Sequence, residues 1–339
     1  MERTEDSALF RLAYRAMCEY GVDVEEVFRR CGIPRDLLSR KDLRTPHEAQ
    51  QRFWQTLEDV TGDPHIGLHL GDCLPVFKGQ ILEYLFLSSP TFGEGLDRAL
   101  RYQRLISDAT QGRLEIDGET AHLVIGPLSS DPLTVRHFSD AFTLGLLKFL
   151  RYVTEDHFQP LEVWLQHPAY LPLEDYTERF GCPVRLDQPE NRVIFDAAML
   201  AHPSAHHEPE LLAAHEAIAN RQVARLALND IVAQVRRAIG EQLESGEVTL
   251  TRVAEQIGIK PRALRARLSE AGTSFNQILA DYRCYLARRL LARTDESIDE
   301  IVYLTGFSEP STFYRAFKRW VGMTPVEYRQ AHRTGNSGP

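Results

Sequence analysis

The chain has 339 residues, of which 43% are hydrophobic and 26% are charged, a balance that is ordinary for a globular protein and excludes a disordered or fibrous chain. A length greater than that of one compact core predicts two domains. The net charge of -9 conceals an asymmetry, because residues 231–339 carry 16 Lys and Arg against 12 Asp and Glu, whereas the first 230 residues carry 23 against 36; the two parts should therefore have different partners.

The first 210 residues combine helical and strand-like patterns. Apolar residues recur at helical spacing in residues 8–60, 82–105 and 134–152. Strand-like segments occupy residues 113–117, 122–125, 161–165 and 193–195, and the first two predict a hairpin across Gly118. Because strands and helices do not alternate regularly, we expect an α+β domain with an antiparallel sheet or a small barrel.

Helical patterns alone follow residue 210. Residues 202–209 are typical of a loop, and residues 210–242 are mostly helical. A helix, a turn and a second helix are predicted in residues 249–268, where Gly258 permits the turn and Pro261 suits a first helical position.

The second helix of this unit has one apolar and one basic side. On a helical wheel Leu264 and Leu268 share the buried side. The opposite side carries Arg262, Ala263, Arg265, Ala266 and Arg267. An arginine-rich face suits the major groove of DNA, because Arg can pair bidentately with guanine and can also bind phosphate.

The same pattern recurs in residues 297–320. Ser297 can cap the first helix, and Gly306 lies in the turn. The second helix has an apolar side of Phe313, Phe317 and Trp320 and an opposite side of Ser311, Thr312, Tyr314, Arg315 and Lys318. One such hairpin also occurs in enzyme cores, but two in tandem, joined by a long helix through residues 282–290, point to successive major grooves of duplex DNA.

Residues 304–325, LTGFSEPSTFYRAFKRWVGMTP, and the following Tyr328-Arg329 closely resemble the signature of the AraC/XylS family. With the first unit, the resemblance covers residues 235–332. The groove-facing positions of the family fall on Arg262, Ala263, Arg265 and Ala266, and on Ser311, Thr312, Tyr314 and Arg315, the faces that the helical wheels also select. Ala266 stands where Arg is frequent in the family, and Lys260 stands where a capping Ser is usual. The first unit should therefore read bases through Arg262 and Arg265, or contribute mainly backbone contacts.

The N-terminal half resembles the arabinose-binding-like domain of one AraC subgroup, on the stretches 61–71, 180–184 and 192–196. This resemblance implies a cupin-like barrel with added helices. It does not imply that the domain binds arabinose. The whole resemblance implies a regulatory domain in residues 1–210 that binds an effector or dimerises, a helical linker in 211–234, a DNA-binding domain in 235–332 and a disordered tail in 333–339.

The function that the resemblance implies is sequence-specific regulation of transcription. Activation is favoured over repression, because members of the family are more often activators. Its expected partners are double-stranded promoter DNA, a small-molecule effector, RNA polymerase and a second copy in a homodimer. Two alternatives stay open: a regulator without a ligand, whose N-terminal domain only dimerises or contacts a protein, and an enzyme with a helical accessory domain. The enzyme needs a catalytic constellation in residues 1–210, and no such pattern is found there.

The remaining polar clusters favour surface roles. The histidines His65, His69, His202, His206, His207 and His215 lack the patterns of a metal site. The adjacent carboxylates Glu174-Asp175 and Asp295-Glu296 point apart on a helix and favour solvation over acid–base catalysis. The cations Arg136, His137, Lys148 and Arg151 could attract an anionic effector, but exposed surface charge is the favoured interpretation.

Localisation follows from the same sequence. It contains no apolar run of 18 residues, and charges interrupt its first thirty residues, so neither a membrane span nor a secretory signal is expected. The cysteines occur singly, at Cys18, Cys31, Cys73, Cys182 and Cys284. Such spacing is typical of a reducing cytoplasm and of a protein without a metal or other cofactor.

Overall fold

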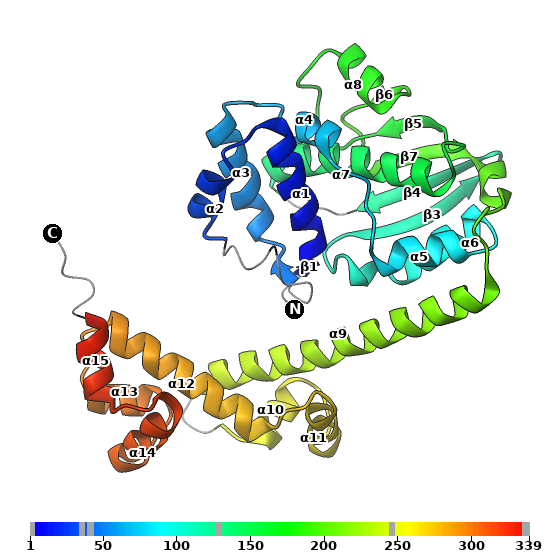
Figure 1. The fold of residues 1–339 in the computed structure, drawn as a ribbon. Helices are drawn as coiled ribbons and strands as arrows, with labels where there is room; N and C mark the ends of the chain where they lie inside the picture. The colour runs from blue at the N-terminus through cyan, green and yellow to red at the C-terminus, as the bar shows by residue number, and fades with distance from the viewer. Residues whose placement is uncertain (1–3, 34–37, 39–43, 127–130, 244–247, 334–339) are drawn as a thin grey trace. The chain divides into compact units, whose positions relative to one another are not determined.

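The computed structural model describes residues 4–33, 38, 44–126, 131–243 and 248–333, and the chain divides into two compact units, residues 1–223 and 224–339 (Figure 1). Within the described residues, the first unit contains helices and strands and the second contains helices alone. The predicted fold class, an α+β domain followed by an all-α domain with two helix-turn-helix units, is confirmed. Among the described residues, no helix combines the length and the apolar character needed to cross a bilayer.

The helices of the first unit are α1 (Ser7–Tyr20), α2 (Val24–Cys31), α3 (Ala49–Thr61), α4 (Ile66–Cys73), α5 (Ile81–Ser88), α6 (Phe92–Arg101), the short η2 (Gln103–Leu105), α7 (Pro132–Val153), α8 (Leu173–Phe180) and η3 (Ala197–Ala201). Several of them begin at a residue whose side chain caps the helix, and several end at a glycine. Asp6 and Thr91 accept hydrogen bonds from the first turns of α1 and α6, and Gly21 ends α1 in the left-handed region at φ 86°.

The main sheet has five strands in the order β3-β4-β7-β5-β6. They are β3 (Gln111–Asp117), β4 (Thr120–Gly126), β5 (Pro160–Trp164), β6 (Val184–Arg185) and β7 (Asn191–Asp196). The predicted hairpin is confirmed as the antiparallel pair β3–β4, in which Leu114 lies opposite Leu123. Among the strands of the described residues, only β5 and β6 pair in parallel. A separate two-stranded ribbon joins β1 (Thr4–Asp6) to β2 (Arg44–Pro46).

The form of the main sheet differs from the expected cupin-like barrel. Its order ends at β3 on one side and at β6 on the other, and these edges do not pair within the described residues, so the sheet is open. The edge strand β6 has two residues. The apolar face of the sheet is covered by helices in place of further strands, since the cluster around Val193 and Phe195 includes residues of α5, α6 and α7.

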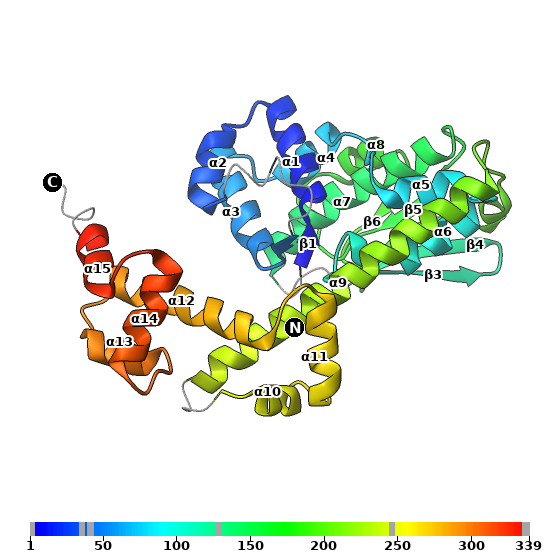
Figure 2. The ribbon, with the colours of Figure 1, turned by 60° about the horizontal axis from the view of Figure 1, so that its bottom comes forward.

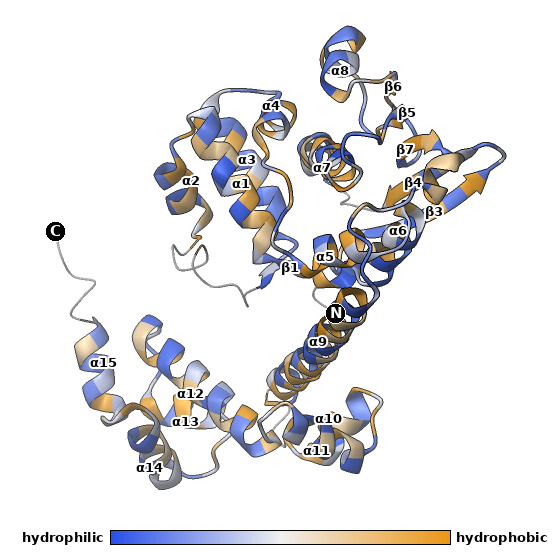
Figure 3. Cartoon of the chain, turned by 45° about the vertical axis from the view of Figure 1, so that its right-hand side comes forward, coloured by the Kyte–Doolittle hydropathy of each residue, from blue (hydrophilic) through white to orange (hydrophobic). Residues whose placement is uncertain are grey.

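Helix α7 is the centre of the first unit. In Figure 3 it lies between α1, α3 and α4 on one side and the strands on the other. Leu144, Leu147 and Leu150 belong to the apolar cluster of the sheet, whereas Phe138 and Ala141 belong to the cluster formed with α1–α4. One helix therefore separates two cores.

The long helix α9 (Pro209–Leu243) includes the predicted linker, residues 211–234. Its N-terminal turns contact α6 and the residue that follows α6 within the first unit: Arg98 Nε donates to Glu216 Oε1 at 2.9 Å, and Tyr102 Oη donates to Asn220 Oδ1 at 2.9 Å. Its last turns supply Ile231, Val235 and Ile239 to an apolar cluster of the second unit. Residues 334–339 of the predicted tail lie outside the described residues.

The second unit continues with α10 (Leu250–Gln256), α11 (Pro261–Glu270), α12 (Phe275–Arg293), α13 (Ile298–Leu304), α14 (Pro310–Val321) and α15 (Pro325–Arg333). Figure 2 shows α12 running from the pair α10–α11 to the group α13–α15. Its N-terminal residues Phe275 and Ile278 pack with the first group, and its later residues Ala287 and Leu291 pack with the second. The unit thus has two small cores on one shared helix.

Candidate nucleic-acid interface

The first helix-turn-helix unit, α10 and α11, is built from local signals. Thr249 Oγ1 accepts from the backbone N–H of Arg252 at 3.3 Å and caps α10. Gly258 adopts φ 72° in the turn, where a residue with Cβ would be strained. Leu264 and Leu268 on α11 are buried in the first core, which turns the arginine-rich side of α11 outward, as the wheel predicts.

The second unit, α13 and α14, repeats this geometry. Ser297 Oγ accepts from the N–H of Glu300 at 3.1 Å, so the predicted cap is confirmed. Gly306 adopts φ 73° in the turn. The residue after the turn glycine bonds back to the first helix in the same way in both units: Ile259 N–H donates to Ala254 O at 2.9 Å, and Phe307 N–H donates to Val302 O at 3.1 Å.

The ten predicted contact residues lie on α11 and α14 as the sequence indicates. Eight of them are exposed: Arg262, Arg265, Ala266, Arg267, Ser311, Thr312, Arg315 and Lys318. Ala263 and Tyr314 are half-buried, and Tyr314 packs on the core of the second unit. The predicted faces are therefore surfaces on which another molecule can lie, although Tyr314 has less of its ring available.

The cations on these faces make no close ion pair among the described residues, although the carboxylate of Glu327 exerts a longer-range attraction on Lys318. Within the residues that the structure covers, no ion pair joins a carboxylate to Arg262, Arg265, Arg267, Arg315 or Lys318. Within the described part of the chain, Arg315 Nε donates to the backbone oxygen of Ser311 alone, at 3.3 Å. Unpaired cations on a convex helix face are suited to phosphate oxygens and to guanine, whose acceptors they can reach without breaking an internal pair.

A groove of about 430 Å³ runs beside α14. Thr312, Arg315 and Arg319 line it from α14, and Asn276 and Arg283 line it from α12. Arg319 and Asn276 are exposed and were not predicted as contact residues. The signal for Arg319 was present, since it follows Arg315 by one helical turn. Asn276 gave no signal, because only the tertiary fold brings α12 beside α14.

Arg283 fixes the turn of the second unit to α12. Its Nη2 donates to the backbone oxygen of Gly306 at 2.8 Å, and its guanidinium lies 4.7 Å from the ring centroid of Phe307. Burial lowers the pKa of Arg283. Through Nη2 and the face of the guanidinium, this partly buried cation holds the turn in place and positions α14, while its Nε has no hydrogen-bond partner among the described residues.

The polar clusters set aside from the sequence have structural partners. His69 Nδ1 lies 2.7 Å from Asp63 Oδ2, and His215 Nδ1 lies 3.1 Å from the hydroxyl of Ser88. His207 Nδ1 lies 2.9 Å from the carbonyl oxygen of Ser88. The described residues contain no group of three His, Cys, Asp or Glu side chains placed to hold a metal ion.

The favoured placement of Arg136, His137, Lys148 and Arg151 on exposed surface is wrong. His137 is fully buried with Nε2 at 2.9 Å from Glu58 Oε2, and burial is the main cause that lowers its pKa. Lys148 Nζ donates to three backbone carbonyls at the end of α4. The reason is the central position of α7, which is packed on both sides, so that its polar residues become anchors between helices.

Comparison with known protein families gives two matches. Residues 21–204 match the family described as the arabinose-binding domain of AraC transcription regulators, N-terminal. Residues 253–331 match a helix-turn-helix domain family. The two matches divide at the helix α9 and together account for most of the chain.

Similar proteins are transcription regulators over nearly their full length. The ornithine utilization regulator of Pseudomonas aeruginosa is 28% identical over 93% of each chain. An HTH-type transcriptional regulator of Mycobacterium tuberculosis is 35% identical over 93% of this chain and 94% of its own. The crystal structure of the transcriptional regulator CdpR from Pseudomonas aeruginosa, 20% identical, covers 95% of this chain and 98% of its own with a TM-score of 0.49.

Proposed function

Because this chain belongs to the AraC family of DNA-binding transcription regulators, with an N-terminal domain of the arabinose-binding type, we propose that it binds promoter DNA sequence-specifically and does so under the control of a small molecule. Its relatives are regulators and not enzymes. The observation that carries the proposal is the repeated geometry of the two helix-turn-helix units, each with an exposed, unpaired polar face on its second helix.

The two faces are assigned different roles in this proposal. On α14, Arg315 and Thr312 read base edges, and Lys318 binds phosphate. On α11, Arg262 and Arg265 read bases, and the half-buried Ala263 permits close approach of the backbone. Both units bind the same duplex, because they share α12 and carry a net positive charge in an otherwise acidic chain.

The domains have separate tasks. Residues 1–210 form the regulatory domain, residues 211–234 are the helical linker, and residues 235–332 bind DNA. The acidic composition of the first 230 residues supports this division, since a segment with 36 Asp and Glu against 23 Lys and Arg repels phosphate. The names of the relatives support a small-molecule effector, as one refers to ornithine utilization and the N-terminal family to arabinose.

The proposed output is activation of transcription in the cytoplasm through contact with RNA polymerase, by a homodimer whose two copies meet through their N-terminal domains. The alternative is a regulator without a ligand, whose N-terminal domain only dimerises or contacts a protein. Ligand-induced thermal stabilisation of the full chain separates the two, because only a domain that binds a small molecule in its folded state gains stability from it.

The first experiment is a titration of the purified protein into promoter fragments from its own genomic neighbourhood, with random DNA as competitor, at two salt concentrations. We expect binding that survives the competitor and weakens steeply with salt. Equal affinity for promoter and random DNA contradicts sequence-specific reading. Failure to select any site from a genomic library, with and without candidate effectors, contradicts the proposed DNA-binding function.

A further inference from the structure

The first unit contains a cavity of about 290 Å³, close to the lower limit of roughly 300 Å³ for small-molecule sites. It lies where both apolar clusters meet. Its walls come from β1 and α1, β2 and α3, α4 to α6, the segment 103–112, β4 and α7. The walls are mostly hydrocarbon and aromatic, with Phe53, Phe86, Phe138, Phe142 and Phe149 among them.

The cavity has no positive charge in its lining. The described residues around it include no Lys, Arg or His side chain. Among the described lining residues, the one ionisable group is Glu5, which is 1% exposed. An anionic ligand would therefore lose its hydration without finding a cationic side chain to pair with, and it would also lie near the carboxylate of Glu5.

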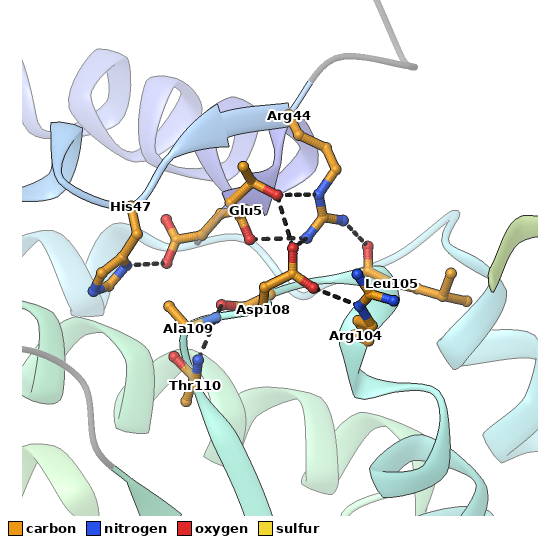
Figure 4. Close-up of polar contacts among 10 residues, drawn as sticks. Glu5, Arg44, His47, Arg104, Leu105, Asp108, Ala109 and Thr110 are labelled. Carbon is orange, nitrogen blue, oxygen red and sulfur yellow. Dashed lines mark hydrogen bonds and ion pairs between the residues drawn. The ribbon is translucent and has the colours of Figure 1, made fainter. Parts of the chain in front are cut away.

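Most polar groups of the lining are occupied by the protein itself. Figure 4 shows Glu5 beside His47, whose Nδ1 lies 3.0 Å from Oε1; the other oxygen accepts from Gln50 Nε2 at 2.5 Å. Gln103 bonds both the N–H and the carbonyl of β3 residue Gly112. A sugar, which needs a partner for each hydroxyl, would find these groups already paired.

Two polar atoms of the lining residues, unlike those above, have no hydrogen-bond partner in the described part of the protein. Thr110 Oγ1 and Trp54 Nε1 are buried and have no hydrogen-bond partner among the described residues. Trp54 is 4% exposed, and the backbone N–H of Thr110 is already bound to Ser107 Oγ at 3.2 Å. A buried indole N–H and a buried hydroxyl without partners together favour a ligand that brings a hydrogen-bond acceptor.

We propose that this cavity binds an uncharged, mainly hydrocarbon small molecule that carries one or two oxygen acceptors, which are bound by Thr110 and Trp54. The assignment rests on the proposed function, whose effector it describes by chemical class. It excludes a sugar, a carboxylate and a zwitterionic amino acid as occupants of this cavity.

The position of the cavity connects such a ligand to the helix that leads into the DNA-binding unit. Leu96, Ala99 and Leu100 of α6 line the cavity. On the same helix and just after it, Arg98 and Tyr102 hold the first turns of α9 through Glu216 and Asn220. A ligand that moves α6 therefore acts on the attachment of α9.

The test uses the full chain and the fluorescent probe N-phenyl-1-naphthylamine, which is uncharged and brightens in apolar surroundings. Displacement of the probe is measured with 1-decanol, decanoate and arabinose. We expect 1-decanol to displace the probe at least about 10-fold more strongly than decanoate, because the anion is buried without a cation. Arabinose should not displace it.

Variants locate the site. Thr110→Val keeps the shape of the side chain. It should lower the affinity for 1-decanol about 5- to 10-fold, as expected for the loss of one hydrogen bond, and leave the affinity for the probe unchanged. Thr177→Val, a matched change on α8 outside the cavity lining, should alter neither. Ala13→Phe places a ring at the lining and should abolish probe binding; thermal melting confirms that each variant is folded.

The outcomes separate this inference from the proposed function. Displacement by arabinose or decanoate as strong as by 1-decanol overturns the ligand class and leaves effector control standing. No binding of probe or 1-decanol means that protein side chains fill the cavity, which also overturns the inference. Binding of 1-decanol that follows the expected pattern but leaves promoter affinity unchanged supports the ligand class and contradicts control through this cavity.

Discussion

The two helix-turn-helix units share a backbone and differ in what they pack and present. Both first helices have seven residues and a hydroxyl cap, and both turns place glycine at φ near 72°. On α11 the two core positions are the aliphatic Leu264 and Leu268, whereas the aromatic Phe313 and Phe317 occupy the same places of α14. The same local signals therefore produce the same backbone motif in both units, and the units differ in the side chains of their cores and of their outward faces.

Their outward faces differ at one position above all. Counted from the proline that begins each second helix, Ala266 of α11 corresponds to Arg315 of α14. The second unit thus has a long donor where the first has a methyl group. In the proposed function the second unit therefore contributes more of the base discrimination. The first unit reads bases through Arg262 and Arg265, which lie at neighbouring positions of α11.

The largest expected difference between the units is in their turn glycines. A Cβ at Gly258 would meet nothing within 4 Å, whereas one at Gly306 would overlap Leu243 and crowd Arg283. Alanine in the left-handed region costs about 1 kcal/mol, and crowding in a packed site adds about 1–2 kcal/mol. We expect Gly306→Ala to lower local stability by about 2–3 kcal/mol and Gly258→Ala by about 1 kcal/mol.

Hydrogen exchange of the α10–α11 and α13–α14 segments measures the two losses separately in the full chain. Equal losses in the two variants would mean that the contacts of Gly306 with α9 and α12 do not constrain its turn.

The next effect concerns base reading. Arg315→Ala should reduce discrimination between promoter and random DNA by about 1–3 kcal/mol, since a bidentate contact to a base is lost. Competition binding at constant salt measures it. Arg293→Ala, which removes an exposed cation at the end of α12, is the matched control. If Arg315→Ala weakens specific and random DNA equally, the assignment of Arg315 to a base edge is wrong.

A smaller and less selective effect is expected from Lys318. Lys318→Ala should weaken binding to all sequences alike and reduce the slope of log affinity against log salt by about 1, because one phosphate contact is removed. Affinities for promoter and random DNA at several salt concentrations provide the measurement. A change of discrimination with an unchanged salt slope would instead place Lys318 at a base.

The smallest effect concerns the caps of the second helices, which both units lack. Neither Lys260 nor Glu309 makes a side-chain cap hydrogen bond. Serine at either position should stabilise its helix by about 0.5–1 kcal/mol, with the larger gain for Lys260→Ser, because a cation at a helix N-terminus opposes the helix dipole and a carboxylate favours it. Hydrogen exchange of α11 and α14 tests this order, and a larger gain for Glu309→Ser would contradict it.

The sequence by itself determined the helix-turn-helix units, the hairpin β3–β4, the long helices α7, α9 and α12 and the exposed faces of α11 and α14. Their signals are local: caps, turn glycines, alternation and helical spacing all act within a few residues of one another. Repetition of the signals made the interpretation specific, since Gly258 and Gly306 begin the same turn in two places.

Only the tertiary structure decided which residues from distant segments meet. The ribbon β1–β2 joins two three-residue segments, Thr4–Asp6 and Arg44–Pro46, too short to show a pattern. Burial of His137, the groove that Asn276 shares with Arg315, and the open sheet in place of a barrel depend on packing between elements. The cavity beside Thr110 and Trp54 belongs here as well, because an empty volume is a property of walls assembled from the whole unit, and no single stretch of sequence encodes it.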